Sequence, residues 1–417
     1  MRQEQLRSVL RRTLAPALVM VMLVAACNPA FGLSTEKLLH VFNATNGKSA
    51  NGALVSDASG NLYGVTASGG AYSGGVAYML SRNSSGTWIE TVLHNFGNSK
   101  NKDGTAPYNN LIFDAAGNLY GTTYIGGTDD LGTVYELSPA TGGKWTETVL
   151  HNFRGGIGDG SNPEAGLLFD AAGNLFGTTF LAGAYAKGTA FELSPVSGGG
   201  WTEKLIWSFG NGTDGANPDG ALVLDSARNL YGTTANGGVK NYGTVYELSP
   251  AGGNWAEAIL HNFGTSQDGT YPYSTLVFDA IGNLFGTTTS GGGPKGHGTV
   301  FELSPAGGGA WTETILYVFA AGSDGYDPYA EQLVFDTAGN LYGTTLQGGT
   351  HGSGIVFKLS PASSGYWTET QLHTFKNGID GAAPFAGVIL DSSGNLYGTT
   401  AGGGSSGGNG VVYEIIP

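Results

Sequence analysis

The sequence has few of the residues that form disulfides, nucleic-acid surfaces or membrane spans. Cys27 is the single cysteine of 417 residues, so no disulfide can form within the chain. Only 12% of the residues are charged, and 32 Asp and Glu against 18 Lys and Arg give a net charge of −14. After the first residues there is no basic stripe or cluster. These features argue against nucleic acid and against an anionic membrane surface as partners.

Motifs for several established chemistries are also missing. The sequence contains no His-Glu-x-x-His pair, no phosphate-binding loop and no cysteine-containing metal spacing. From these absences we expect no cofactor, and we assign no catalytic residue and no metal ligand from a motif.

One ten-residue segment, Asp114–Thr123 (DAAGNLYGTT), recurs seven times with small changes. Successive copies are 57, 56, 55, 54, 57 and 55 residues apart. A period this regular indicates a repeat architecture. The copies centre on Asn61, Asn118, Asn174, Asn229, Asn283, Asn340 and Asn395.

Each repeat predicts four short β-strands. In the second copy, apolar residues 110–114 precede a Gly-Asn turn and a second strand at 119–123. A Gly-Gly loop leads to a third strand at 132–138, and a further turn leads to a fourth at 145–153. Short links force neighbouring strands to be antiparallel. A four-stranded unit repeated four to eight times is typical of a β-propeller.

The two ends of the chain complement each other. The last repeat stops after its third strand at 411–417, and residues 34–42 (STEKLLHVF) align with the fourth strand at 201–209 (WTEKLIWSF). We therefore predict an all-β fold at 34–417, a seven-bladed propeller of four-stranded antiparallel blades whose last blade is closed by the N-terminal strand. Such closure removes exposed strand edges. A linear β-solenoid with capping repeats is the alternative.

The first residues predict export. Four arginines precede the apolar run at 17–26, which is shorter than the ~20 residues of a membrane span. We expect a signal peptide at 1–26 and a short linker at 27–33. Cys27 follows small residues, as in a bacterial lipoprotein signal, so we predict it as a lipid anchor and the only membrane attachment. The alternative is an ordinary signal cleaved near Ala30 or Gly32. Either leaves the protein outside the cytoplasm.

The repeated segments Gly-Asn-Leu-Tyr-Gly-Thr-Thr, Gly-Thr-Val-Tyr-Glu-Leu-Ser-Pro and Trp-Thr-Glu-Thr resemble the GloVer tandem repeat. Proteins with this repeat are described as having a choice of anchor. The resemblance covers residues 34–417. It implies a location outside the cytoplasm, and it supplies no catalytic residues.

Several repeated polar residues predict structural roles. The aspartate before each tight turn, such as Asp114, is expected to accept hydrogen bonds from turn amides. The fourth-strand histidines, such as His94, are replaced by Trp207 and Tyr317 in two blades, so we expect a planar ring for packing. The fourth-strand glutamates, such as Glu147, are expected to form a solvated rim, offset in register from the third-strand glutamates.

The links between blades contain candidate ligands. Six of them read Asp-Gly-x-x-Pro, and the first link degenerates to Asn46-Gly47. We expect these links to share one face with the Gly-Gly loops. A ring of carboxylates there would suit Ca²⁺ or sugar hydroxyls, whereas ordinary turn chemistry is the structural alternative. The six are Asp103, Asp159, Asp214, Asp268, Asp324 and Asp380.

The residue after each of these prolines varies between blades. Loops that differ on a constant frame are where function tends to lie. Aromatic residues mixed with acids at such positions would suit stacking on sugar rings or a protein contact. The residues are Tyr108, Glu164, Asp219, Tyr273, Tyr329 and Phe385, of which the aromatic ones are our candidate ligand-binding residues.

Three functions follow as hypotheses. The first is a monomeric, non-enzymatic binding propeller outside the cytoplasm that recognises a glycan or a protein through the variable face. The second is a hydrolase or lyase that uses loop carboxylates, with or without Ca²⁺; it requires two acids ~5–10 Å apart with divergent pKa values. The third is a structural spacer. A single asymmetric pocket lined by acids and aromatics at the channel mouth would separate the third from the others.

Overall fold

The computed structural model describes residues 34–417 except positions 101, 265–266, 295, 330–331, 363–366 and 405–406. The expected signal peptide, the linker and Cys27 lie outside the described residues. Ser34–Pro417 form one compact unit. The part of the chain that the structure describes has one short 3₁₀ turn, η1 (Thr141–Gly143), and no helix with the length and hydropathy of a membrane span.

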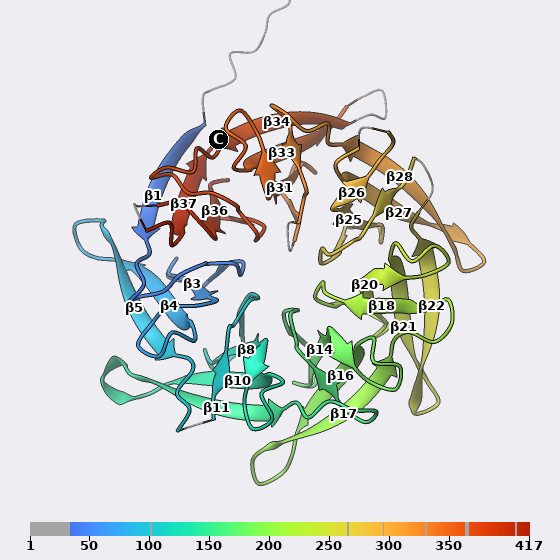
Figure 1. Cartoon of the computed structure of the whole chain (residues 1–417), viewed down its shortest axis with the longest axis horizontal. Coiled ribbons are helices and arrows are strands. Elements are labelled where there is room, and N and C mark those ends of the chain that lie inside the picture. The colour runs from blue at the N-terminus through green and yellow to red at the C-terminus, as the bar shows by residue number, and fades with distance from the viewer. Residues whose placement is uncertain are drawn as a thin grey trace, which may run out of the picture. The chain divides into compact units, whose positions relative to one another are not determined.

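Seven antiparallel sheets stand around a central axis as the blades of a propeller (Figure 1). The first strand of each blade has two residues: β2 (Val55–Ser56), β7 (Ile112–Phe113), β13 (Leu168–Phe169), β19 (Val223–Leu224), β24 (Val277–Phe278), β30 (Val334–Phe335) and β35 (Ile389–Leu390). The second strands are fully or largely buried: β3 (Leu62–Thr66), β8 (Leu119–Thr123), β14 (Leu175–Thr179), β20 (Leu230–Gly237), β25 (Leu284–Thr288), β31 (Leu341–Thr345) and β36 (Leu396–Thr400).

The third and fourth strands form the outer part of each blade. The third strands are β4 (Val76–Arg82), β10 (Thr133–Pro139), β16 (Thr189–Pro195), β21 (Thr244–Ala251), β27 (Thr299–Gly307), β33 (Ile355–Pro361) and β37 (Val411–Ile416). The fourth and outermost strands are β5 (Trp88–Asn95), β11 (Trp145–Asn152), β17 (Trp201–Ser208), β22 (Asn254–Asn262), β28 (Ala310–Val318), β34 (Trp367–Thr374) and β1 (Thr35–Val41). The sequence prediction of seven four-stranded blades is confirmed.

Strand β1 closes the ring. It comes from the start of the described chain and pairs antiparallel with β37 at the end, with Glu36 opposite Ile415 and Leu38 opposite Tyr413. The seventh blade is therefore the sheet β1-β37-β36-β35, built from both ends of the chain. Figure 1 shows β1 on the outside of β37 and β36. This pairing confirms the predicted closure and excludes a linear solenoid.

The core lies between blades. One cluster joins Tyr63 and Val65 of the first blade to Leu111, Leu119 and Tyr135 of the second, and the pattern repeats around the ring. The glycine in each second strand allows this packing: a Cβ on Gly121 would lie 2.5 Å from the Tyr135 hydroxyl. Each blade thus covers its apolar faces with its neighbours, because a single four-stranded sheet cannot bury both faces alone.

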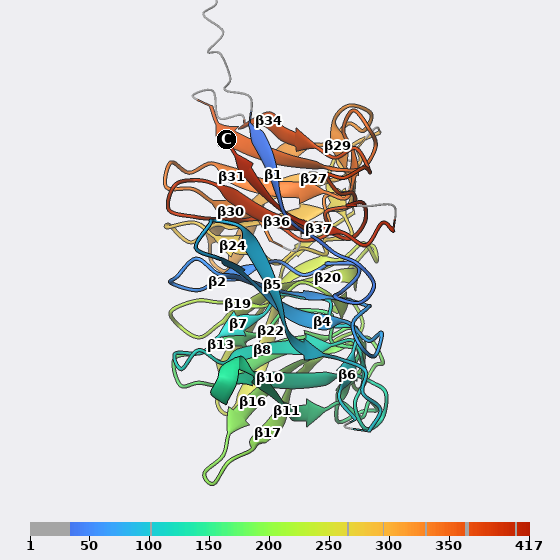
Figure 2. The ribbon, with the colours of Figure 1, turned by 90° about the vertical axis from the view of Figure 1, so that its left-hand side faces the viewer.

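The propeller has two different faces (Figure 2). The tight turns between first and second strands lie on one side, which we call the turn face. The links between blades and the Gly-Gly loops lie on the other, the loop face. They pair there as short strands, which confirms that they share a face: β6 (Gly104–Thr105) with β9 (Ile125–Gly126), β12 (Gly160–Ser161) with β15 (Leu181–Ala182), β18 (Gly215–Pro218) with β20, β23 (Gly269–Thr270) with β26 (Ser290–Gly291), and β29 (Gly325–Tyr326) with β32 (Gln347–Gly348).

Candidate functional site

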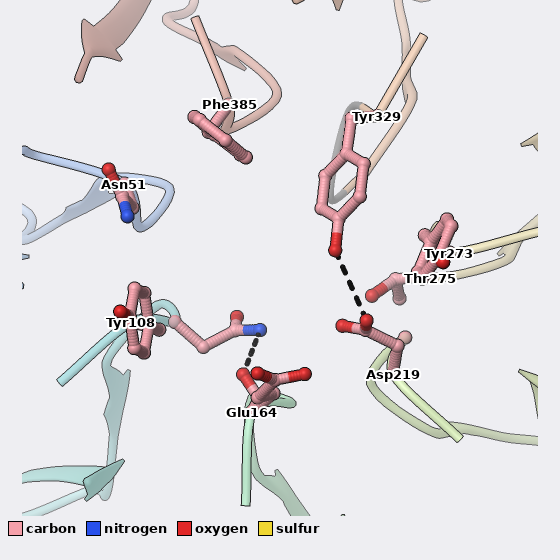
Figure 3. Close-up of a pocket in the computed structure, with 10 residues that line it drawn as sticks. Asn51, Tyr108, Glu164, Asp219, Tyr273, Thr275, Tyr329 and Phe385 are labelled. Carbon is pink, nitrogen blue, oxygen red and sulfur yellow. Dashed lines mark hydrogen bonds between the residues drawn. The ribbon is translucent and has the colours of Figure 1, made fainter. Parts of the chain in front are cut away.

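Seven side chains, one from each blade, surround the central axis (Figure 3). They come from the segment that runs from each link into the first strand, and they line a cavity of about 320 Å³. We call this set the channel ring and the cavity the channel pocket. Asn109, Gly220 and Thr275 complete its lining. The channel ring consists of Asn51, Tyr108, Glu164, Asp219, Tyr273, Tyr329 and Phe385.

The backbone around each ring residue is fixed by repeated contacts. Before Glu164, Asn162 adopts a positive φ of 56°, which is sparsely populated for a residue with a side chain. Pro163 then packs against Gly132 of the preceding blade, where an added Cβ would lie 2.6 Å from the proline Cδ. After the ring residue, Thr122 Oγ1 donates a hydrogen bond to the Ala165 carbonyl. These contacts hold the side chain toward the axis whatever its type.

Two acids form one side of the channel ring. Asp219 is buried, and its Oδ2 accepts a hydrogen bond from the Tyr329 hydroxyl at 3.2 Å. The carboxyl groups of Glu164 and Asp219 hydrogen bond to each other. Burial raises the pKa of Glu164 to about 8, and the charge of Asp219 adds to this rise. Burial also raises the pKa of Asp219 to about 7. The pair therefore keeps a shared proton near neutral pH, and Glu164 is the donor.

Aromatic rings form the other side. Tyr273 and Tyr329 are stacked with centroids 4.7 Å apart, and Phe385 meets Tyr329 edge to face at 5.4 Å. Tyr108 lies across the channel beside Asn51 (Figure 3). Pairs in these geometries are mutually stabilising, so the walls are preorganised. The four aromatic residues that the sequence singled out are thus brought together, and Glu164 and Asp219 join them.

Asn51 is the ring residue that sequence reasoning missed. Ala50 replaces the proline in the first blade, so the Asp-Gly-x-x-Pro pattern does not mark this position. A second signal was present: Asn51 lies ten residues before Asn61, as Tyr108 lies ten before Asn118. The side-chain oxygen of Asn51 is buried and accepts no hydrogen bond from the described residues. Buried polar atoms are usually paired, so this oxygen is available to a ligand.

A second cavity, of about 530 Å³, adjoins the channel pocket. It shares Tyr273, Tyr329 and Phe385 with the channel pocket and extends past His297 and Tyr326 of the loop face. The rings of His297 and Tyr326 lie 5.5 Å apart. We call this cavity the side groove. It gives the channel pocket an aromatic-lined path toward the loop face.

The six link aspartates lie elsewhere. None of them is among the described residues that line the channel pocket. Each is bound near its own link: Asp103 Oδ1 accepts a hydrogen bond from the Gly97 amide, and its Oδ2 is 3.2 Å from His94 Nε2. The structure therefore does not bring Asp103, Asp159, Asp214, Asp268, Asp324 and Asp380 together as one ring of ligands.

Each link aspartate belongs instead to a set of three side chains between two blades, which we call an interface cluster. Each set contains the His, Trp or Tyr side chain from the fourth strand of one blade, the link residue, and the fourth-strand glutamate of the next blade. Taken around the ring, the clusters are His40-Asn46-Glu90, His94-Asp103-Glu147, His151-Asp159-Glu203, Trp207-Asp214-Glu257, His261-Asp268-Glu313, Tyr317-Asp324-Glu369 and His373-Asp380-Glu36.

The fourth-strand position that holds histidine in five blades requires more than a planar side chain. His94 packs edge to face on Phe96 at 4.6 Å, as expected for packing. In the two blades without histidine, Trp207 Nε1 donates to Asp214 Oδ2 at 3.3 Å and the Tyr317 hydroxyl donates to Asp324 Oδ2 at 3.2 Å. The shared property is a planar ring with a polar atom at its far end that reaches the link residue.

The fourth-strand glutamates do not form a solvated rim. In all seven, Oε1 is buried and accepts no hydrogen bond from the described residues. Burial raises the pKa of Glu147 to about 7, and the charge of Asp103 contributes to this rise. The expectation failed because it considered one blade, whereas the next blade covers this side chain. The predicted register is confirmed: Glu147 lies opposite Leu137, and Glu136 lies opposite Thr148.

The turn aspartates have the predicted structural role. Asp114 Oδ1 accepts hydrogen bonds from the amides of Ala116 and Asn118, and Oδ2 accepts from the Asn118 side chain and the Tyr120 hydroxyl. Burial acts to raise the pKa of Asp114, but these hydrogen bonds outweigh it and hold the pKa below its usual value. Both carboxylate oxygens of such an aspartate accept hydrogen bonds from its own turn, so neither is left for a ligand.

The repeat itself is recognised by comparison. The model of the Gloeobacter/Verrucomicrobia repeat matches residues 27–168, 142–333 and 292–417. The chain belongs to this repeat family. The resemblance read from the sequence is thus confirmed. No curated protein matches the chain.

Three solved structures that are similar to this member of the Gloeobacter/Verrucomicrobia repeat family are distant in sequence. A candidate glucose dehydrogenase-type oxidoreductase from Thermus thermophilus is 16% identical with a TM-score of 0.44, covering 73% of this chain and 95% of its own. A candidate 6-phosphogluconolactonase from Bacteroides uniformis is 14% identical with a TM-score of 0.49, covering 76% and 83%. A candidate gluconolactonase is 12% identical with a TM-score of 0.41, covering 93% and 92%.

Proposed function

We propose that this protein is a non-enzymatic binding propeller outside the cytoplasm, and that its channel pocket takes a neutral sugar unit of a glycan. The observation that carries the proposal is the channel ring: seven equivalent positions on a repeated frame hold an asymmetric set of aromatic, acidic and amide side chains. A purely structural spacer does not require such a set, because the repeated backbone contacts fix each position irrespective of its side chain.

The chemistry of the lining selects the ligand class. Tyr108, Tyr273 and Phe385 offer aromatic faces for the apolar C–H side of a sugar ring. Asn51 and the shared-proton pair of Glu164 and Asp219 offer acceptors and donors for hydroxyl groups. No Lys or Arg is among the described residues that line the pocket, so an anionic ligand would meet no counter-charge.

The size of the site also suits a glycan. A cavity of about 320 Å³ is at the lower end of the ~300–1,000 Å³ of small-molecule pockets. The side groove, with about 530 Å³ next to it, supplies room for further units that extend toward the loop face. We therefore propose that the end of a chain occupies the channel pocket and that the next unit lies against His297 and Tyr326.

The geometry of the acids favours binding over hydrolysis. Glycosidases keep their two carboxyl groups ~5–10 Å apart to leave space for the sugar or for water. Glu164 and Asp219 hydrogen bond to each other, and their pKa values, about 8 and about 7, are both raised rather than pushed apart. Two carboxyl groups in direct contact leave no space between them for the sugar bond or for an attacking water.

Glycan-array screening of the purified protein, followed by calorimetry, tests the proposal. Tyr273→Ala and Tyr329→Phe are the site variants: the first removes an aromatic wall, and the second removes the hydroxyl that orients Asp219. We expect at least a tenfold rise in Kd for Tyr273→Ala, which corresponds to ~1.4 kcal/mol. Tyr72→Ala is the control, because Tyr72 is a 53% exposed tyrosine of a Gly-Gly loop that lies outside the pocket.

Three outcomes would contradict the proposal. Glycan binding that Tyr273→Ala leaves unchanged would place the ligand elsewhere. Selective binding of organic cations in place of sugars would mean that the acids act as a counter-charge beside an aromatic cage. Release of shortened glycan, lost in Glu164→Gln, would mean that the hydrolase hypothesis is the correct one.

Location and assembly are also part of this proposal. The apolar leader at 17–26 and its cysteine support export and a lipid anchor at Cys27, with the propeller acting as a monomer. Metabolic labelling with a palmitate analogue, compared between the wild type and Cys27→Ser, tests the anchor. Labelling that persists in Cys27→Ser would contradict it.

A further inference from the structure

The interface cluster between the fourth and fifth blades differs from the other six. His261 of β22, Asp268 of the link and Glu313 of β28 each present one ligand atom, and these three atoms lie within 4.8 Å of one another. His261 Nε2 is 3.3 Å from Asp268 Oδ2 and 3.8 Å from Glu313 Oε2. Among the described residues, this is the one group of three His, Cys, Asp or Glu side chains that meets such a distance limit.

Asp268 is the side chain that calls for a ligand here. It is 3% exposed, and its buried Oδ1 meets no N–H or hydroxyl donor among the described residues, so the Glu313 carboxyl group is the remaining hydrogen-bond partner of this carboxyl group. In two other clusters a backbone amide donates to the equivalent oxygen: Asp159 Oδ1 accepts a hydrogen bond from the Gly160 amide, and Asp324 Oδ1 accepts one from the Gly325 amide. Unpaired buried carboxylate oxygens are costly unless a proton or a cation compensates them.

Two other link aspartates share the unpaired oxygen but lack the rest of the site. Oδ1 of Asp214 and Oδ1 of Asp380 are also buried without an N–H or hydroxyl donor among the described residues. The cluster of Asp214 has Trp207 in place of histidine, and its indole nitrogen is a donor only. The cluster of Asp380 does not bring three ligand atoms within 4.8 Å of one another. An Oδ1 without an N–H or hydroxyl donor and a converged set of three ligands thus occur together only at Asp268 among the clusters that the structure describes.

We propose that His261, Asp268 and Glu313 bind one divalent transition-metal ion of the zinc type between the fourth and fifth blades. One imidazole nitrogen and two carboxylate oxygens are zinc ligands, and bonds of ~2.0–2.1 Å at tetrahedral angles place neighbouring ligand atoms roughly 3.3–3.4 Å apart. The observed 3.3 and 3.8 Å are close to this spacing. Calcium is disfavoured, because it takes 6–8 oxygen ligands.

The neighbouring contacts orient the ligands. The His261 ring packs edge to face on Phe263 with centroids 4.6 Å apart, which directs Nε2 toward the carboxyl groups. The Gly264 amide donates to Asp268 Oδ2 at 3.1 Å and fixes that carboxyl group. Since the ligands come from two blades and their link, the ion fastens one blade to the next.

The chain provides its own matched variants for the test. Two blades use tryptophan or tyrosine in place of histidine and still reach the link aspartate, as Trp207 and Tyr317 do. His261→Tyr and His261→Trp should therefore fold and pack while losing the nitrogen ligand. His94→Tyr is the control for general loss of histidine, because His94 lies in an interface cluster where three ligand atoms do not converge.

The experiment is a zinc titration of the full chain after removal of metal with a chelator, read by calorimetry and by native mass spectrometry. We expect one zinc ion per chain in the wild type and in His94→Tyr, at least a 100-fold weaker Kd in His261→Tyr, and a Tm that rises with zinc only in the first two. Melting in the chelator should be similar for all three proteins.

Two results would overturn the proposal. Wild-type protein that takes up no zinc at 100-fold molar excess would show that the carboxyl groups share a proton instead. Zinc that binds His261→Tyr as tightly as the wild type would show that surface histidines bind it. Asp268→Asn supports the distinction, because it keeps the shape of the cluster but should weaken zinc binding as His261→Tyr does.

Discussion

The channel ring and the interface clusters are both seven-fold, but they differ in what varies. At the channel ring the frame is constant and the side chain changes among Asn, Tyr, Glu, Asp and Phe. At the interface clusters the side chains are nearly constant, with a glutamate in all seven and an aspartate in six. The ring residues face the channel pocket, whereas the cluster residues contact the next blade. Side chains that hold the repeats together are thus fixed, and those that face the pocket are free to differ.

The largest expected effect comes from breaking the frame itself. Deletion of residues 34–42 removes β1 and leaves the outer edge of β37 unpaired. It also removes Phe42, a fully buried side chain whose loss alone costs ~3–5 kcal/mol. We expect loss of the cooperative thermal transition, measured by circular dichroism, and oligomers in size-exclusion chromatography, because open strand edges associate.

Adding a peptide of residues 34–42 in trans should restore the monomer. A deletion variant that stays monomeric and melts at the wild-type Tm would mean that the seventh blade does not need β1.

The next effect is the combined titration of the buried carboxyl groups. Burial raises the pKa of the seven fourth-strand glutamates from 4.5 to about 7 in five of them, to about 8 in Glu313 and to about 9 in Glu257. Their folded forms hold protons that the unfolded chain releases above pH 4.5, so the free energy of unfolding falls as pH rises through these folded-state values.

Histidines oppose this trend at lower pH. Burial lowers the pKa of His40 from 6.5 to about 4, so its contribution to the free energy of unfolding grows between pH 4 and 6.5. Above pH 6.5 the carboxyl groups act alone, and we expect the Tm to fall from pH 6.5 to about 8 and then only slightly to about pH 9, where Glu313 and Glu257 are the fourth-strand glutamates that still release protons. Replacing Glu147, Glu203 and Glu369 by glutamine should flatten the decline; an unchanged slope would contradict the assignment.

A single interface aspartate gives a smaller effect. Asp103→Ala leaves the Gly97 amide and the His94 ring without their acceptor, and each buried unpaired group costs ~1–3 kcal/mol. We expect about 3 kcal/mol less stability in urea unfolding. Asp103→Asn should cost under about 1 kcal/mol, because Asn46 already occupies this position in another interface cluster and donates to Glu90.

The matched control is Asp129→Ala, since Asp129 is an exposed loop residue and such changes stay within about 0.5 kcal/mol. Equal losses for Asp103→Ala and Asp129→Ala would remove the distinction between interface and surface.

The smallest expected effect on stability has the opposite sign. Asp219→Asn at the channel ring removes a carboxyl group whose pKa burial raises to about 7, so an uncharged amide should fit the site at pH 8 without the cost of a buried charge. We expect stability to be unchanged or higher by up to about 1 kcal/mol, together with weaker glycan binding. Parallel melting and calorimetry check this. A marked loss of stability would place Asp219 among the structural residues.

The fold could be predicted because its signals are local. The turn asparagines give the period, and the match of residues 34–42 to the fourth strands gives the closure. The channel ring was reached through a single residue, the proline before each position, so Asn51 was missed where Ala50 replaces it. The interface clusters were not reachable in this way, because Asp103 and Glu147 are 44 positions apart and meet only when two blades pack. The sequence of a repeat shows which residues recur, but it does not show which residue of the next repeat each of them contacts.

The pairing of β1 with β37 also sets an order of events. A ribosome makes β1 before any other described strand, and its partner last. β1 therefore stays without this partner until β37 has been made, and the seventh blade assembles by a contact between the first and the last of the described strands. Contacts between residues far apart in sequence are slow to form. The propeller therefore closes in one late step, when β37 has been made and pairs with β1.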